Sequence, residues 1–151
     1  MINKNCRSFN FMFRKPDAEV PEVEAILATS HEKWMRTTHQ GPAEPSPLVY
    51  TITQAAELKN SLDPSEGTTG QTMMALAEVY RGLERSQAHM ESSAGWQDIG
   101  VMLEKVIANY SVGMIMHGEV VGSMADMIFR ADNLEVMKKM INSEKPRRCL
   151  C

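Results

Sequence analysis

The sequence predicts an all-α fold, an elongated antiparallel helical bundle of the coiled-coil type. Two observations lead to this prediction. The first is composition: aromatic residues make up only 6% of the 151 residues, whereas 13 are methionine, a flexible side chain that fills irregular gaps between helices. The second is a long C-terminal run of apolar residues at alternating spacings of four and three, which is typical of the seam between packed helices.

The length suits one domain, and a hydrophobic content of 43% is enough for a core. Charge divides the chain into three parts. Residues 1–16 form a basic and aromatic N-terminal segment, residues 17–143 form the helical bundle domain, and residues 144–151 form a basic tail that contains cysteine.

The first helix is expected over residues 17–40. Pro21 suits a first helical turn, and the acidic residues around it lie near the positive end of the helix dipole. Val23 and Leu27 share one face, which places them towards the core. Gly41, followed by proline, is a helix stop signal.

Two further helices are expected, over residues 48–62 and 69–92, separated from each other and from the first helix by loops rich in proline and glycine. In the second helix of the chain, Ile52 and Leu62 point inward. The apolar stripe of the third alternates by three and four. Its members are Met73, Leu76, Tyr80, Leu83 and Met90, with Gln87 at the remaining position of the repeat.

The fourth helix, over residues 96–142, carries the longest apolar repeat. It would be roughly 70 Å long at about 1.5 Å per residue. A helix of that length needs a partner along its seam, so we expect a homodimer, or a heterodimer with a related helical protein. The candidate seam residues are Leu103, Val106, Tyr110, His117, Val120, Met124 and Met127.

No motif in the sequence indicates catalysis. His31-Glu32 begins like the helix of a zinc protease, but the second histidine is missing. No pair of titratable groups stands at a spacing that suggests acid–base work. We therefore expect no enzyme, with no catalytic residue, no cofactor, no metal site and no small-molecule substrate.

Charge and cysteine content bear on partners and compartment. The net charge of −3 argues against nucleic acid as a partner, although both ends of the chain are basic. Three cysteines, Cys6, Cys149 and Cys151, are an odd number near the termini, and no signal peptide is visible, so a cytoplasmic, reducing location is expected. The Cys149-Leu150-Cys151 ending leaves two alternatives open, lipid attachment and an accidental tail.

Four stretches carry a resemblance to a known family: 9–17, 31–38, 69–83 and 106–119. In this order they resemble the region that links the PX domain to the BAR domain of sorting nexins, followed by part of the BAR domain. The resemblance implies a curved helical dimer that associates peripherally with endosomal membranes. Such a dimer would act in membrane curvature and endosomal vesicle trafficking. The sequence departs from the family in lacking a PX domain and in having an acidic middle.

The resemblance also implies contact of the N-terminal segment with an anionic membrane surface. Apolar side chains would insert between lipids while basic ones bind the headgroups. The residues concerned are Lys4, Arg7, Phe9, Phe11, Phe13, Arg14 and Lys15.

The alternative is a soluble helical adaptor or chaperone-like protein. It would bind partner helices in a groove rich in methionine, a residue that adapts to many partners. The groove residues would be Met73, Met74, Met114, Met116, Met124 and Met127.

Overall fold

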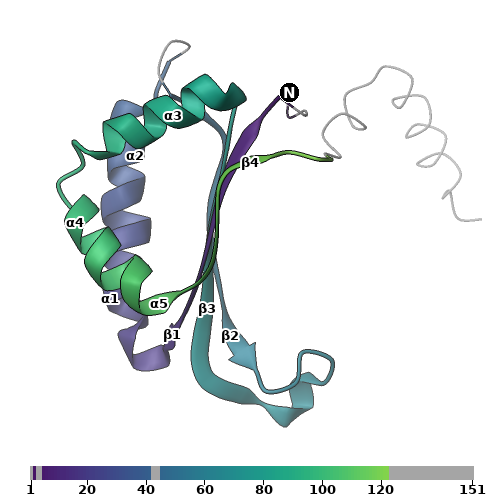
Figure 1. Ribbon diagram of the computed structural model, residues 1–151. Helices are drawn as coiled ribbons and strands as arrows, with labels where there is room; N and C mark the ends of the chain where they lie inside the picture. Colours follow the sequence, from purple (N-terminus) through teal and green to yellow (C-terminus); the bar gives the residue numbers. More distant parts are fainter. Residues whose placement is uncertain (1, 3–4, 42–44, 123–151) are drawn as a thin grey trace, which may run out of the picture.

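A computed structural model describes residues 2, 5–41 and 45–122 of the chain. Its centre is a four-stranded antiparallel sheet with the spatial order β2-β3-β1-β4. The strands are β1 (Arg7–Pro16), β2 (Pro47–Leu58), β3 (Thr68–Tyr80) and β4 (Ser111–Glu119) (Figure 1).

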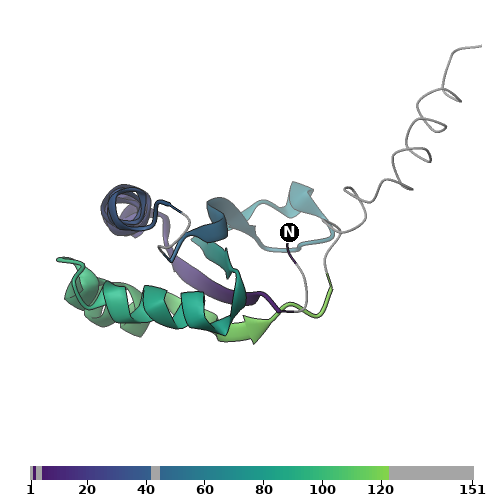
Figure 2. The same ribbon diagram turned by 90° about the horizontal axis from the view of Figure 1, so that it is seen from above.

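The α- and π-helical segments lie together on one face of this sheet, as Figures 1 and 2 show from two directions, and a short 3-10 helix, Pro64–Glu66, lies in the loop between β2 and β3. A first helical segment begins with a 3-10 turn and contains a π-helical stretch between two α-helical ones; its parts are Asp17–Glu19, α1 (Val20–Glu24), Ala25–His31 and α2 (Glu32–Thr38). The helix α3 (Gly82–Ser93) follows β3 directly. The last segment again has a π-helical middle; its parts are α4 (Ile99–Val101), Met102–Ile107 and α5 (Ala108–Tyr110).

Alternation of side chains explains the two central strands. In β1, Phe9 and Phe13 are 1% and 0% exposed and point to the helices, whereas Met12 on the opposite face is 46% exposed. In β3 every second residue from Thr72 to Tyr80 is buried. This period of two is the pattern of a strand with one covered face.

The core fills the space between the sheet and the helices. Phe13 from β1 and Met74 and Leu76 from β3 form a cluster with Leu27 and Val106 of the helical segments. A second cluster joins Phe9, Tyr80 and Met35. Burying such side chains contributes about 1.5–3 kcal/mol each to folding, so this layer is the main source of stability.

The all-α prediction is wrong, because strands take up most of the helix expected over 48–62 and parts of the helices expected over 69–92 and 96–142. Residues 48–58 form β2, where Val49, Tyr50 and Thr51 are residues favoured in strands. Residues 69–80 form β3. The apolar residues that were expected to share one helix face do not share a face of this strand, since Met73 lies on the opposite side from Leu76. The helix expected over 17–40 is confirmed, from Asp17 to Thr38.

The long helix expected over 96–142 ends at Tyr110, after which the chain forms β4 and pairs with β1. Two glycines, Gly113 and Gly118, fall in the part that became a strand, and glycine weakens a helix by about 1 kcal/mol relative to alanine. The rest of the expected helix, beyond residue 122, lies outside the described residues, as does the tail 144–151. Within the expected N-terminal segment 1–16, the residues Arg7–Pro16 form β1, an inner strand of the sheet.

Across the described parts of the chain, no helix has the length and apolar character needed to cross a membrane.

Candidate functional site

An interior cavity of about 180 Å³ lies between the sheet and the helices. Its wall is mostly apolar, with Phe11 and Leu76 from the sheet and Trp96 and Met102 from the helical layer. The polar side chains that reach it are His31, Glu78, His89 and Ser93. Clustered polar groups in an apolar cavity are the usual arrangement of a ligand site.

Three separate elements bring the charged and imidazole groups of this cavity together. His31 ends the π-helical stretch of the first helical segment, Glu78 lies on β3, and His89 lies on α3. They are 5%, 1% and 6% exposed. We call these three residues the His–Glu–His cluster.

Glu78 lies between the two imidazoles. Its Oε1 is 3.8 Å from His31 Nε2, and its Oε2 is 3.4 Å from His89 Nε2. One ligand atom from each residue fits within 4.8 Å of the other two. The cluster therefore offers two nitrogen lone pairs and a carboxylate at one point in the protein.

Each member of the cluster is also held from outside. The Tyr50 hydroxyl lies 3.0 Å from His31 Nδ1, and His39 Nε2 lies 2.9 Å from His89 Nδ1. The Tyr80 hydroxyl donates a hydrogen bond of 2.7 Å to Glu78 Oε2. These contacts fix the orientation of all three side chains.

Burial dominates the ionisation of these groups. It raises the pKa of Glu78 to about 7, against an opposing effect of the hydrogen bond from Tyr80. It lowers the pKa of His31 and of His39 to about 4 and that of His89 to about 3. The three histidines are therefore neutral near pH 7, with lone pairs available.

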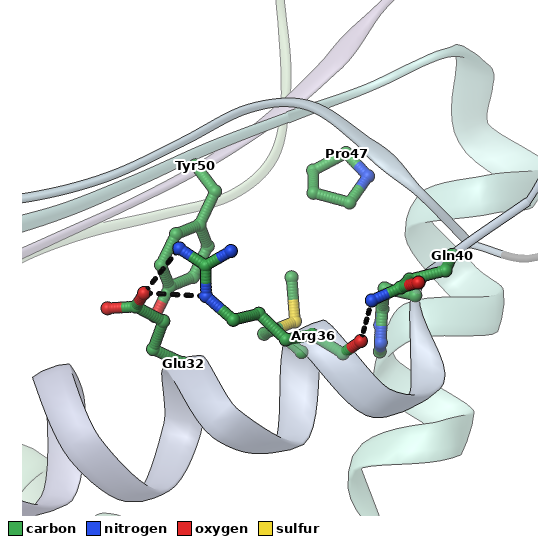
Figure 3. A pocket seen from close by; sticks show the side chains of 7 residues that line it. Glu32, Arg36, Gln40, Pro47 and Tyr50 are labelled. Atoms are coloured by element: carbon green, nitrogen blue, oxygen red, sulfur yellow. Dashed lines mark hydrogen bonds and ion pairs between the residues drawn. The ribbon is translucent and has the colours of Figure 1, made fainter.

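A second pocket, of about 310 Å³, lies between α2 and the start of β2 (Figure 3). There Arg36 forms an ion pair of 2.7 Å with Glu32 beside the ring of Tyr50, and Gln40 hydrogen-bonds to the Arg36 carbonyl. Tyr50 and His39 line this pocket and also contact the His–Glu–His cluster. They separate the outer pocket from the interior site.

The residues expected to contact a membrane are placed in the sheet. Phe9, Phe13 and Lys15 are buried, and Lys15 Nζ donates to the Val20 carbonyl at 2.7 Å. Phe11 lines the interior cavity. The two arginines form ion pairs, Arg7 with Glu119 at 3.3 Å and Arg14 with Glu57 at 2.8 Å. Lys4 lies outside the described residues. The aromatic side chains of this strand therefore pack towards the helical layer.

The expected partner seam is split between different surroundings. Val106 is buried in the core, while Leu103 is 51% exposed beside the cavity. The Tyr110 hydroxyl donates to Glu19 at 2.6 Å, and His117 Nδ1 lies 2.6 Å from the Ser86 hydroxyl. Val120 follows β4, where its amide donates to the Cys6 carbonyl. Met124 and Met127 lie outside the described residues. Dimer formation itself stays a prediction.

Sequence reasoning missed the His–Glu–His cluster. One signal was available: Glu78 occupies an inward position in the alternating pattern of β3, where a carboxylate needs a partner. In the sequence, His31 belongs to a protease motif that lacks its second histidine. The grouping depends on the fold, because the three residues are far apart in the sequence.

Comparison with known proteins gives little beyond this geometry. No family model matches the chain, and no curated protein matches it. Among solved structures it is similar to the "Putative antibiotic biosynthesis monooxygenase from Nitrosomonas europaea", with 14% identity and a TM-score of 0.43 over 82% of this chain and 98% of that one. A likeness this distant does not assign the chain to that protein's family or activity.

The sorting-nexin resemblance is wrong, because a BAR domain is helical and this chain is built on an antiparallel sheet. The prediction of a dimerisation module for membrane curvature and endosomal trafficking falls with it. The adaptor alternative is also wrong, because it required a groove between helices: Met73 and Met74 lie on opposite faces of β3, and Met114 and Met116 lie in β4. The expectation of no enzyme rested on the lack of paired titratable groups, and the His–Glu–His cluster supplies them.

Proposed function

We propose that this protein is an enzyme that binds a small, mainly apolar molecule in the interior cavity and acts on it at the His–Glu–His cluster. The observation that supports this most is the coincidence of the two features. The apolar cavity and the buried titratable cluster share the same wall, at His31, Glu78 and His89.

The cavity size limits the ligand. A volume of about 180 Å³ is below the range of about 300–1,000 Å³ that is usual for drug-sized ligands. The wall offers few hydrogen-bonding groups outside the cluster. The expected substrate is therefore a small ring or short chain with one polar group, and that group would face Glu78.

The side of the cavity formed by the Met102–Ile107 stretch and β4 offers a way in. Leu103, Met114 and Met116 line the cavity and are 51%, 50% and 41% exposed. Their side chains form an apolar rim open to solvent, so a ligand can enter without opening the core. We call these three residues the apolar rim.

The chemistry available inside is proton transfer. A carboxylate flanked by two neutral imidazoles can take a proton from a bound molecule and pass it to a neighbour within 3.4–3.8 Å. Exclusion of water strengthens every electrostatic interaction with the substrate. General acid–base catalysis of this kind contributes typically about 10²–10⁴-fold to a rate.

A probe substrate tests both parts of the proposal. The probe 5-nitrobenzisoxazole is a small, mainly apolar molecule. Its ring opening needs only one base, which removes a ring proton as the N–O bond breaks. With chelator present, we expect saturable turnover above the buffer rate. Glu78→Gln should lower kcat/KM at least tenfold by removing the base. Leu103→Trp should do so by filling the apolar rim.

Matched controls separate these effects from general damage. Glu91→Gln changes an exposed carboxylate on α3, and Leu62→Trp adds a ring at a position that is 93% exposed. Both should keep the wild-type rate. Wild-type protein no faster than buffer, or equal rates in all four variants, would contradict the proposal.

A further inference from the structure

We propose that His31, Glu78 and His89 bind one divalent transition-metal ion, through the Nε2 atoms of the two histidines and the carboxylate of Glu78. This deepens the proposed function: the proton transfer by Glu78 belongs to the metal-free protein, and Glu78 serves as a ligand once the ion is bound. Only the role given to the open coordination positions rests on the proposed function. Two imidazoles and a carboxylate are a recognised ligand set for first-row metals, and they leave positions free for substrate.

A chain of hydrogen bonds determines which nitrogen of His89 carries its proton. The Thr38 hydroxyl donates to the Trp34 carbonyl at 2.7 Å, so its oxygen is left to accept from His39 Nδ1, also at 2.7 Å. A neutral His39 protonated on Nδ1 has a lone pair on Nε2. That lone pair accepts from His89 Nδ1 at 2.9 Å. His89 Nε2 is therefore unprotonated, and it faces Glu78.

This arrangement sets a nitrogen lone pair against carboxylate oxygens. Two electron-rich groups 3.4 Å apart repel each other in a buried site unless a proton or a metal ion lies between them. The separations of 3.4 and 3.8 Å are longer than a hydrogen bond of about 2.7–3.2 Å. They are close to the roughly 3.0–3.4 Å that separates two ligands of one metal at about 2.1 Å each.

The contacts behind the ligands match those of built metal sites. A metal-binding histidine usually donates its other ring N–H to a nearby acceptor, which fixes the ring. Here Tyr50 and His39 occupy those places, at 3.0 and 2.9 Å from the two Nδ1 atoms. Tyr80 holds one carboxylate oxygen at 2.7 Å. Tyr50, His39 and Tyr80 are therefore positioning residues.

The chemistry of the site also limits which metal fits. Nitrogen ligands suit Zn²⁺, Fe²⁺ or Co²⁺, whereas Mg²⁺ and Ca²⁺ require oxygen ligands. With three ligands from the cluster, the remaining positions face the apolar cavity lined by Phe11 and Trp96. A bound substrate could occupy them.

Titration of metal-free protein with Co²⁺ tests the inference, because tetrahedral or five-coordinate Co²⁺ absorbs visible light. We expect one ion per chain at micromolar affinity or better, displaced by Zn²⁺. His31→Gln, His89→Gln and Glu78→Gln should each weaken binding at least 100-fold. His117→Asn is the matched control: it removes a histidine that is not a proposed ligand and that hydrogen-bonds to Ser86, and it keeps a residue suited to the positive φ of 52° there.

A second measurement covers variants that fold poorly. In wild-type protein, Zn²⁺ should shift the imidazole nitrogen resonances of His31 and His89 and leave those of His117 in place. Co²⁺ binding that is absent in wild type, or unchanged in all three glutamine variants, would overturn the inference. The inference would also be overturned if Glu78 and His89 still shared a proton in the presence of saturating Zn²⁺. Turnover of the nitrobenzisoxazole is measured in chelator, so its failure is distinct from the failure of metal binding.

Discussion

Glu78 occupies an inward position of β3 between Leu76 and Tyr80, where an apolar residue would fit the pattern. At 1% exposure its carboxyl group depends on its neighbours for hydrogen bonding. The Tyr80 hydroxyl provides one bond directly, and Tyr80 is itself buried with a raised pKa. A polar pair of this kind keeps a reactive carboxylate in place within an otherwise apolar core.

At the residue scale, Tyr80→Phe tests this pair. Removing the hydroxyl leaves Glu78 short of a buried hydrogen bond, so the free energy of unfolding should fall by about 1–3 kcal/mol. The same change should raise the pKa of Glu78 further. Urea unfolding measures the first effect, and pH titration of the Glu78 carboxyl carbon by NMR measures the second.

Tyr110→Phe is the matched control, because its hydroxyl also donates to a carboxylate, Glu19, at 2.6 Å. Tyr110 is only half-buried, so water can replace the lost bond. Its loss should cost less than about 0.5 kcal/mol. Equal losses in the two variants would show that burial of Glu78 does not matter.

The connection between β3 and α3 sets the distance between Glu78 and His89. Only Arg81 separates the last residue of the strand from the first of the helix. Gly82 begins the helix with a φ of 85°, a left-handed conformation that other residues rarely adopt. The sharp turn folds α3 back over the sheet and brings His89 above Glu78.

At the element scale, Gly82→Ala should therefore destabilise the protein by about 1–2 kcal/mol. The cost is in the backbone, since an added Cβ would meet only the Asn5 carbonyl oxygen at 3.9 Å. Gly95→Ala, without a positive φ and with its nearest contact at 3.5 Å, should change stability little. Thermal unfolding compares the two. A Gly82 variant as stable as the Gly95 variant would rule out strain at this turn.

Over the whole molecule, the buried titratable groups make stability depend on pH. His31, His39 and His89 have folded pKa values of about 4, 4 and 3, against 6.5 when exposed. Their contribution is complete above pH 6.5 and is lost as the pH falls towards 4, because only the unfolded chain binds the protons. Glu78 acts in the opposite direction: its pKa of about 7 lies above 4.5, so the folded state binds a proton first.

The three histidines lower stability as the pH falls, and Glu78 alone opposes them. We therefore expect metal-free protein to lose stability on acidification from pH 6.5 to 4.5. The loss per histidine approaches about 1.4 kcal/mol per pH unit, and Glu78 offsets roughly one of the three. Urea unfolding at several pH values in chelator measures the slope. His39→Gln should make it shallower by removing one titrating group. Stability that stays constant or rises over this range would contradict the assigned protonation states.

The first helical segment was the element most accessible to sequence reasoning. Its signals are local: Pro21 in the first turn, Val23 and Leu27 one turn apart, and Gly41 after the end. Strands carried local signals too, in the alternating phenylalanines of β1, but methionine and alanine in β3 fit a helix equally well. Antiparallel pairing decided between the two readings, and pairing joins residues that are distant in the chain.

The sequence alone therefore determined the first helical segment and the residue types available for chemistry. Only the tertiary structure decided that Glu78 points inward and that His31 and His89 meet it from two helices. The physical reason is that strand pairing and helix packing are non-local. A strand acquires its inner face, and a carboxylate its partners, only once the sheet and the helical layer are assembled.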